Sequence, residues 1–459
     1  MKSVCSWSFA PYRHPFFNVG DIYVCRIAPG KNDIHFAWLG VPGRPYRIFV
    51  RTRGAENDFV LAGETDLCEY TLRGLAENTD YEFFVESDGA KSRVRIARTG
   101  AVFGTVVNYL HPDDEAYAFS GRYLCSPSLL RLPDGGLLAS MDVYGGGTPQ
   151  NLTLIYRSDD NGATWKYQCE LFPAFWTKLF LYRGEVHALA CSTEYGDLLI
   201  GKSTDGGRTF GLPTVLLRGS NGKGGWTGVH KNPQPVVTFG GRIWNTLEWG
   251  SWGKGFHAAM VMSAPDGADL LDAANWLFSD PLPYTPKAWG LPEFPTIGCI
   301  EGALAVKDGA LYNVMRFHME SFKPKNYGLV LAYRVDTDHP EAPLTFDKAI
   351  EFPANHSKFS IQYHEGRKCY YSIATRITAP EHAGHRNLLS LMKSDDLEHW
   401  EVVTDIQNRL ADDPAKVGMQ YVDFFIEGDK LLFLTRLADN NAHSYHDSNY
   451  SVFASLDLP

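Results

Sequence analysis

Residues 301–316 read EGALAVKDGALYNVMR, and residues 421–436 read YVDFFIEGDKLLFLTR. Each stretch is an apolar strand, a tight turn with Gly and Asp, and a second apolar strand, which predicts a β-hairpin. Four other stretches share this pattern, and the opening and closing residues lie 15 positions apart in all six: Pro127/Asp142, Leu179/Glu194, Pro233/Glu248, Glu301/Arg316, Ile361/Arg376 and Tyr421/Arg436. Repeated hairpins at this spacing are typical of four-stranded propeller blades. We therefore predict an all-β fold with a six-bladed β-propeller over residues 105–459; an ordinary β-sandwich with similar hairpins is the alternative.

The composition excludes several classes of function. The chain of 459 residues carries a net charge of −10, which disfavours nucleic acid as a partner because phosphate contacts need a basic face. No apolar run is long enough for a signal peptide or a membrane span, so we expect a cytoplasmic protein with no membrane partner. The eight cysteines show no CxxC spacing, which favours buried free thiols over a metal cluster.

The first hundred residues follow a different pattern from the hairpins. Short alternating runs, such as IHFAWLG and YEFFVES, are separated by turn signals and predict a small β-sandwich over residues 1–100. The segment CEYTLRGLAENTDYEFFVES resembles the end of a fibronectin type III domain, with Leu75 and Tyr81 at the Leu and Tyr positions of that family. We predict that this unit is separable and carries no catalytic group.

Three hairpins are followed by Asp-box turns, SDDNGATW at 158–165, STDGGRTF at 203–210 and a degraded SDDLEHW at 394–400. These boxes, the hairpin count and the run SPSLLRLPDGGLLASMD at 126–142 resemble the sialidase (neuraminidase) superfamily over residues 105–459. In that family an arginine stands two residues before the first-blade proline and binds the substrate carboxylate with two later arginines. The chain departs from the pattern there, because that position is Cys125.

The resemblance also implies roles for three residues. Glu301 resembles the glutamate that supports a tyrosine nucleophile, Arg316 resembles a later arginine of the triad, and Tyr421 stands where the nucleophile is expected. Since the first arginine is missing, the resemblance favours a sialidase-fold enzyme with another acidic substrate. Fold relatives include hydrolases and lyases of rhamnosyl-uronate and ulvan-type linkages, in which His and Tyr serve as acid and base.

The hairpin register predicts a ring of charge at one end of the propeller axis. The second strands close in Asp142, Glu194 and Glu248 on the first three hairpins and in Arg316, Arg376 and Arg436 on the last three. A ring with one acidic and one basic side suits a sugar held by its hydroxyl groups and by a carboxylate or sulfate. Mutual pairing of these charges across neighbouring blades is the alternative.

Histidines add groups that titrate near neutral pH. His230 precedes the third hairpin, His318 follows Arg316 by two residues, and His443 and His446 stand close together near the C-terminus. We expect His230 or Tyr421 to move the proton at the scissile linkage and the other three histidines to contact substrate. With Asp447, His443 and His446 also offer two imidazoles and a carboxylate, which leaves a metal site as an alternative to no cofactor.

We therefore predict an enzyme that cleaves a glycosidic bond in an acidic oligosaccharide, either an exo-acting hydrolase or a lyase. The catalytic candidates are Tyr421, Glu301, His230 and Asp142. The substrate-binding candidates are Arg316, Arg376, Arg436, Glu248, His318, His443 and His446. A propeller that only binds or scaffolds glycans remains the competing class, because this fold often serves for binding alone. The sequence leaves the oligomeric state open.

Overall fold

The computed structural model describes residues 20–54, 56, 58–220, 226–291, 298–318, 328–354, 357–378 and 384–459, although nothing is described of the His318 side chain. These residues form an all-β protein with short 3₁₀ turns at η1 (Trp252–Lys254), η2 (Ala273–Asn275) and η3 (Pro286–Trp289). Among them no helix is long and apolar enough to span a membrane.

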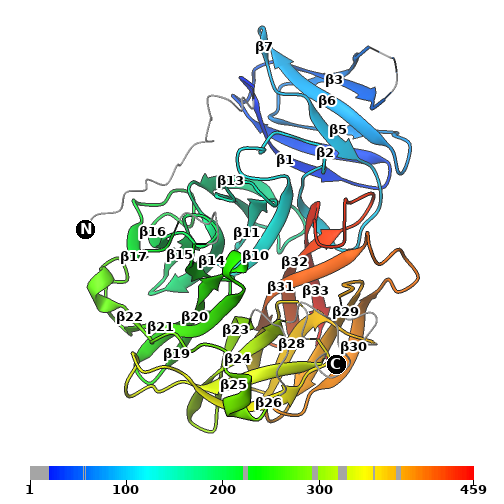
Figure 1. Cartoon of the computed structure of the whole chain (residues 1–459). Helices are drawn as coiled ribbons and strands as arrows, with labels where there is room; N and C mark the ends of the chain where they lie inside the picture. The colour runs from blue at the N-terminus through cyan, green and yellow to red at the C-terminus, as the bar shows by residue number, and fades with distance from the viewer. Residues whose placement is uncertain are drawn as a thin grey trace.

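Two small sheets make up the N-terminal unit (Figure 1). The first sheet has the order β1 (Tyr23–Pro29), β2 (Asp33–Leu39) and β5 (Glu69–Arg73). The second has the order β4 (Val60–Thr65), β3 (Tyr46–Thr52), β6 (Asp80–Ser87) and β7 (Ala90–Lys91), with β8 (Arg95–Arg98) also paired to β6. The alternating burial of β2 follows its sequence, because every second residue of an antiparallel strand faces the other sheet.

The rest of the chain is a ring of antiparallel sheets, which is a β-propeller (Figure 1). Three of the sheets each consist of four strands that are consecutive in the chain. The first is β10 (Tyr123–Arg131), β11 (Leu137–Tyr144), β12 (Leu152–Ser158) and β13 (Lys166–Leu171), and the second is β14 (Phe175–Tyr182), β15 (Glu185–Cys191), β16 (Leu198–Ser203) and β17 (Thr214–Leu217). The third is β27 (Ser360–His364), β28 (Cys369–Thr375), β29 (Leu388–Ser394) and β30 (Glu401–Asn408). A fourth sheet joins β31 (Gly418–Glu427), β32 (Lys430–Ala438) and β33 (Tyr450–Asp457) to the early strand β9 (Thr105–Tyr109). This last pairing closes the ring between its first and last strands.

The middle of the propeller is one nine-stranded sheet. Its two parts meet at a single parallel pair, His257 with Gly298, between β21 and β23. The strands are β18 (Gly228–His230), β19 (Val237–Phe239), β20 (Arg242–Ser251), β21 (Phe256–Pro265) and β22 (Leu277–Phe278), then β23 (Gly298–Lys307), β24 (Ala310–His318), β25 (Leu329–Arg334) and β26 (Thr345–Glu351).

The Asp-box turns connect the third and fourth strands of three sheets. In the first box, Asp160 accepts hydrogen bonds from the Thr164 amide (2.8 Å) and from Ser158 Oγ (2.8 Å), and Trp165 is buried against Phe453. Asp205 and Asp396 make the corresponding contacts in the other two. The boxes are therefore turn-forming devices.

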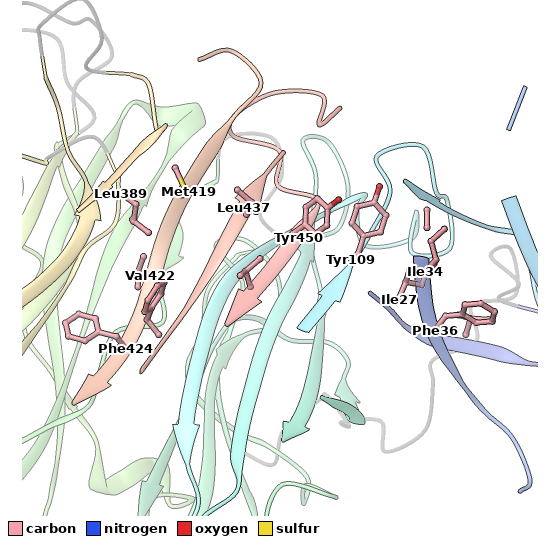
Figure 2. Packing of buried hydrophobic residues seen from close by; sticks show 14 of the residues in the cluster. Ile27, Ile34, Phe36, Tyr109, Leu389, Met419, Val422, Phe424, Leu437 and Tyr450 are labelled. Atoms are coloured by element: carbon pink, nitrogen blue, oxygen red, sulfur yellow. The ribbon is translucent and has the colours of Figure 1, made fainter. Parts of the chain in front are cut away.

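The sandwich and the propeller share one hydrophobic core. Figure 2 shows Ile27, Ile34 and Phe36 of the sandwich on one side of Tyr109 and Tyr450, with the propeller residues on the other. Buried polar contacts also cross the junction, including the Arg95–Asp114 ion pair at 2.7 Å and the Arg26 guanidinium on the Val106 and Val107 carbonyls. The expectation of a separable N-terminal unit did not include this shared core, whose exposure would destabilise both parts.

Candidate functional site

Backbone irregularities in the innermost strands aim side chains at the site. Pairing shifts by a residue between Ile300 and Ala303 in β23 and between Gln420 and Asp423 in β31. Inside these bulges Glu301 has φ 58° and Tyr421 has φ 60°, a left-handed conformation that non-glycine residues rarely adopt. Such strain costs about 1–3 kcal/mol per residue and concentrates at functional sites. The bulges thus direct both side chains to a place that a regular strand would not reach.

Glu301 and Tyr421 are in direct contact. The Tyr421 hydroxyl donates to Glu301 Oε1 at 2.5 Å, and the Arg316 guanidinium donates to Glu301 Oε2. Burial opposes ionisation of Glu301, but the charges of Arg316 and His230 outweigh it and hold the pKa of this carboxyl below its usual value. Burial and the Glu301 charge raise the pKa of Tyr421. These opposite shifts keep Glu301 ionised and Tyr421 protonated in the resting site, and the hydrogen bond between them gives the proton a path to Glu301 when Tyr421 reacts.

Three arginines surround the Tyr421 side chain. Arg316 donates to the Tyr421 hydroxyl at 3.2 Å, while the guanidinium carbons of Arg436 and Arg386 lie 4.1 and 5.8 Å from the ring centroid. All three arginines are buried, although Tyr421 is only half-buried. We call Arg316, Arg386, Arg436, Tyr421 and Glu301 the arginine cluster.

A neutral side chain orients two of these arginines. The Gln420 Oε1 atom accepts hydrogen bonds from Arg386 and from Arg436 (3.2 Å), and the Gln420 amide donates to the Tyr445 carbonyl at 2.7 Å. Because an amide carries no charge, it fixes the guanidinium groups without neutralising them. Burial, together with the like charges of Arg316 and Arg436, lowers the pKa of Arg386 to about 10. The cluster is thus an electropositive site.

Histidine and carboxylate groups lie on the other side of Glu301. His230 Nδ1 is 2.6 Å from Glu248 Oε2, and both residues are fully buried. The His230 ring lies 4.5 Å from that of Trp176 and 4.9 Å from that of His257. Glu248 also accepts from the Gly302 amide at 3.4 Å, which joins these groups to Glu301. We call His230, Glu248, His257 and Glu194 the histidine cluster.

Glu194 is the half-buried carboxyl of the histidine cluster. It accepts a hydrogen bond from Gln150 Nε2 at 2.9 Å. Burial raises the pKa of Glu194, although the His230 charge and the hydrogen bonds from Gln150 and Trp252 act in the opposite direction. A carboxyl with a raised pKa keeps its proton closer to neutral pH, as a general acid must.

The structure corrects two predicted positions. Arg376 does not join the arginine cluster: β28 ends one residue earlier, and the guanidinium of Arg376 pairs with Asp405 at 3.0 Å, while Arg386 takes the expected place. Asp142 is completely buried, and its oxygens accept from Thr153 Oγ1 and the Trp176 amide, both at 2.6 Å. Asp142 therefore supports the start of β14 and does not lie at the exposed end of the axis where the register predicted it.

The C-terminal histidines point in different directions. His446 lies beside the arginine cluster. Partial desolvation and the Arg436 and Arg386 charges lower its pKa, although 46% of its side chain is exposed. His443 contacts Tyr123 (2.9 Å) and Asp113 (3.2 Å). Among the residues that the structure describes, no three His, Cys, Asp or Glu side chains are grouped to hold a metal ion. The predicted contact of His318 lies outside the described side chains.

Sequence reasoning missed Arg386, Gln420 and His257 and did not single out Glu194 as an acid. Arg386 lies outside any hairpin, so the repeat register gives no signal for it. In the second hairpin the register predicted Leu179 at the start of the first strand and Glu194 at the end of the second, but β14 begins at Phe175 and β15 ends at Cys191. Glu194 consequently lies in the loop after β15, where its carboxyl group is the only sequence feature that points to a functional role.

Comparison with solved structures identifies the fold. A Hadza microbial sialidase matches with a TM-score of 0.51 and 12% identity over 98% of this chain and 99% of that one. A Trypanosoma rangeli sialidase in complex with 2,3-difluorosialic acid, a covalent intermediate, matches with a TM-score of 0.50 and 14% identity over 81% of this chain and 56% of that one. A Penicillium chrysogenum α-L-arabinanase complexed with arabinobiose matches with a TM-score of 0.50 and 15% identity over 78% and 98%. No protein-family model and no curated protein matches the sequence. The chain therefore has a sialidase-like propeller fold.

Proposed function

We propose that this protein is an exo-acting glycoside hydrolase that removes an acidic sugar from an oligosaccharide, with Tyr421 as the nucleophile. The observation that carries the proposal is the Tyr421–Glu301 hydrogen bond of 2.5 Å inside a cluster of three arginines. A phenol is a weak nucleophile unless a base takes its proton, and Glu301 is an ionised base in contact with it. The arginines supply the charge that binds a carboxylate beside the reacting carbon.

Although Cys125 stands where sialidases have their first arginine, another arginine can supply the missing positive charge. Arg436 lies close enough to the Cys125 thiol for its charge to oppose the rise in the thiol pKa that burial and Asp142 cause. Arg436 also forms no ion pair with another residue that the structure describes. We infer that Arg436, from the end of β32, supplies the charge that sialidases place on the first blade, so that a carboxylate of a sialic or uronic acid is bound by three arginines.

The proposed reaction has two displacement steps. In the first, the Tyr421 proton passes to Glu301, the phenolate oxygen bonds to the anomeric carbon, and the bond from that carbon to the leaving oxygen breaks. Glu194 donates the proton that the leaving oxygen takes up, and the His230–Glu248 pair behind it sets its environment. In the second step, Glu194 removes a proton from water, the hydroxide bonds to the anomeric carbon, and the Tyr421 phenolate leaves and regains its proton from Glu301.

Two structural proposals accompany this function. We infer that the propeller has six blades. Dividing the nine-stranded sheet at its parallel pair gives β23–β26 as one four-stranded sheet and β18–β22 as another blade, in which β18 and β19 both pair with β20 and together fill one strand position. We also infer that the sandwich is of the fibronectin type III kind, because the Tyr81 hydroxyl accepts from the Ala76 amide at 2.9 Å, as in the tyrosine corner of such sandwiches. A cytoplasmic location remains a prediction.

Product mass tests the proposed reaction. The protein is incubated with sialyl, rhamnosyl-glucuronate and ulvan oligosaccharides and with neutral arabino-oligosaccharides, and the products are analysed by mass spectrometry. We expect release of one acidic sugar with the mass of one added water, and no cleavage of the neutral substrates. Cleavage without added water would indicate a lyase, and binding of an acidic sugar without cleavage would indicate a glycan-binding propeller; either result would contradict the proposal.

A further inference from the structure

The loop between β32 and β33, residues 439–449, supports the arginine cluster from behind; we call it the site loop. The Tyr445 carbonyl accepts a hydrogen bond of 2.7 Å from the Gln420 amide, and the Tyr445 ring centroid lies 5.7 Å from the guanidinium carbon of Arg386. Gln420 in turn accepts from Arg386 and Arg436. The placement of the site loop therefore sets the placement of two arginines of the cluster.

His443 joins the site loop to the connection between β9 and β10. Its Nδ1 atom lies 2.9 Å from the Tyr123 hydroxyl, and its Nε2 atom lies 3.2 Å from Asp113 Oδ1. His443 stands two residues before Tyr445, whose carbonyl holds Gln420. Because both ring nitrogens have partners within the protein, this imidazole holds the loop in place and is not free to bind a sugar.

The segment that carries Asp113 is held by the N-terminal sandwich. Figure 1 shows the site loop on the side of the propeller that faces this unit. Three contacts between ionisable side chains join the sandwich to residues 111–114: Arg95 with Asp114 at 2.7 Å, Asp80 with His111 at 3.5 Å and Arg53 with Asp113 at 2.6 Å. The first of these is buried, so the segment keeps a fixed place beside the sandwich.

The carboxylate of Asp113 bridges the two parts of the protein. Its Oδ2 atom accepts from Arg53, the residue that follows β3 of the sandwich, while its Oδ1 atom faces His443 of the site loop. The hydrogen bond from Arg53 holds the pKa of this carboxyl below its usual value, against the effect of burial. The bridge is therefore ionised at neutral pH, and Arg53 fixes its orientation.

We propose that Arg53 and Asp113 are positioning residues for substrate binding, through which the sandwich sets the placement of Arg386 and Arg436. The contacts run from Arg53 through Asp113 to His443, and from the site loop through Gln420 to the two arginines. The sandwich is then part of the working site although it contributes no group that touches substrate. This inference rests on the proposed function, because it takes the arginines to bind the substrate carboxylate.

Steady-state kinetics of Arg53→Met on an acidic oligosaccharide substrate test the role. We expect KM to rise about two- to fivefold, the range for one partly exposed ion pair, with kcat unchanged, since binding is lost equally in the ground and the transition state. A loss of folded protein alone would lower kcat and leave KM unchanged. Arg53→Lys, which keeps a cation beside Asp113, should recover most of the loss. Arg44→Met removes an ion pair with Asp88 inside the sandwich and should change neither constant.

Hydrogen exchange of the site loop provides a readout that needs no substrate. Arg53→Met and Asp113→Ala should each speed exchange of the backbone amides in residues 441–447 by about two- to fivefold, whereas Arg44→Met should not. Faster exchange in a protein that cleaves no acidic oligosaccharide would support the positioning role and contradict the proposed function. Exchange at the wild-type rate in both variants, or an unchanged KM in an active Arg53→Met enzyme, would overturn the positioning role.

Discussion

The arginine cluster and the histidine cluster lie on either side of Glu301, but they differ in how far their buried charges are compensated by neighbouring groups. On the arginine side, a neutral residue, Gln420, orients Arg386 and Arg436 and leaves their positive charge in place. On the histidine side, the carboxylate of Glu248 is taken up by His230 and by a backbone amide. One side is therefore prepared for an anion from outside, and the other is largely satisfied from within.

This difference separates two tasks that a glycosidase must perform. The arginine side can bind an anionic group and activate Tyr421, because its charges remain available. The histidine side offers one half-buried carboxyl, Glu194, whose pKa is raised and which can give and take a proton. The comparison predicts that changes on the arginine side affect binding and nucleophilic attack, whereas changes on the histidine side depend on the leaving group.

The largest expected effect is that of Tyr421→Phe. Loss of the nucleophile should lower turnover by about 10³-fold or more, because the covalent step is no longer available. One half-buried hydroxyl contributes little to folding, so the Tm should change by no more than a few degrees. Steady-state kinetics and calorimetry measure the two quantities, with Tyr363→Phe at an exposed position as the control. Equal turnover in the variant and the wild type would remove Tyr421 from the mechanism.

Glu194→Gln should have a large effect that depends on the substrate. With a natural oligosaccharide, loss of the general acid should slow turnover by about 10²-fold. With an aryl glycoside whose leaving group needs no proton, the first step should remain fast. Because Glu194 also removes the proton from water in the second step, the first step is followed separately, by the rate at which the leaving group appears in the first turnover. A loss of the same size in this first step on both substrates would contradict the acid role.

The pH profile sharpens the same assignment. Activity requires ionised Glu301, whose pKa is lowered, and protonated Glu194, whose pKa is raised. Activity should therefore fall on the acid side as Glu301 gains a proton and on the alkaline side as Glu194 loses one. Glu194→Gln should remove the alkaline fall with a natural oligosaccharide, at a lower overall rate, and retain the acid one. A profile unchanged by this substitution would place the acid elsewhere.

Arg386→Lys should weaken kcat/KM by about 10- to 100-fold, because lysine keeps the charge but loses the paired donors of a guanidinium. Arg376→Lys is the matched control, since this arginine pairs with Asp405 outside the cluster. Equal losses in both variants would break the distinction between the two positions.

Asp142→Asn should have the smallest effect on turnover and a measurable effect on stability. Burial raises the pKa of Asp142 to about 7, above its value in the unfolded chain, so the folded state favours the protonated form. This contribution to stability is complete below the unfolded pKa of about 4 and is lost as the pH rises through about 7. Chemical denaturation from pH 4 to 8 should therefore show a flatter pH dependence in the variant. The same slope in both proteins would show that Asp142 is ionised throughout.

The sequence carries most of the information about the strands and part of the information about the site. Hairpin patterns with a constant offset predicted the inner strands, and Glu301, Arg316, Tyr421 and Arg436 meet because they occupy equivalent ends of such hairpins. Arg376 satisfies the same pattern, yet its strand ends before it and its side chain turns to Asp405. A register specifies where a backbone position lies, but it does not specify which partner the side chain takes.

The positions of the other site residues are set by structural features that do not recur from one hairpin to the next. Arg386 and Glu194 lie in loops at different distances from the preceding strand. The bulges that turn Glu301 and Tyr421 inward need a left-handed backbone conformation, and the sequence gives no sign of it because neither position is a glycine. The shared core of sandwich and propeller is equally hidden, because Tyr109 and Phe36 look alike in sequence whether they pack within one domain or across two. Long-range packing determines all of these, and a single sequence does not record it.

Covalent trapping tests whether Tyr421 is the nucleophile. The protein is incubated with 2,3-difluorosialic acid, and with a fluorinated uronic acid glycoside if the first probe is not accepted, and the intact mass and the modified peptide are determined. We expect a mass increase of one fluorinated sugar, attached through the Tyr421 oxygen, which Tyr421→Phe abolishes and Arg376→Lys retains. Turnover of an acidic substrate with no adduct from either probe, or an adduct on another residue, would contradict this assignment.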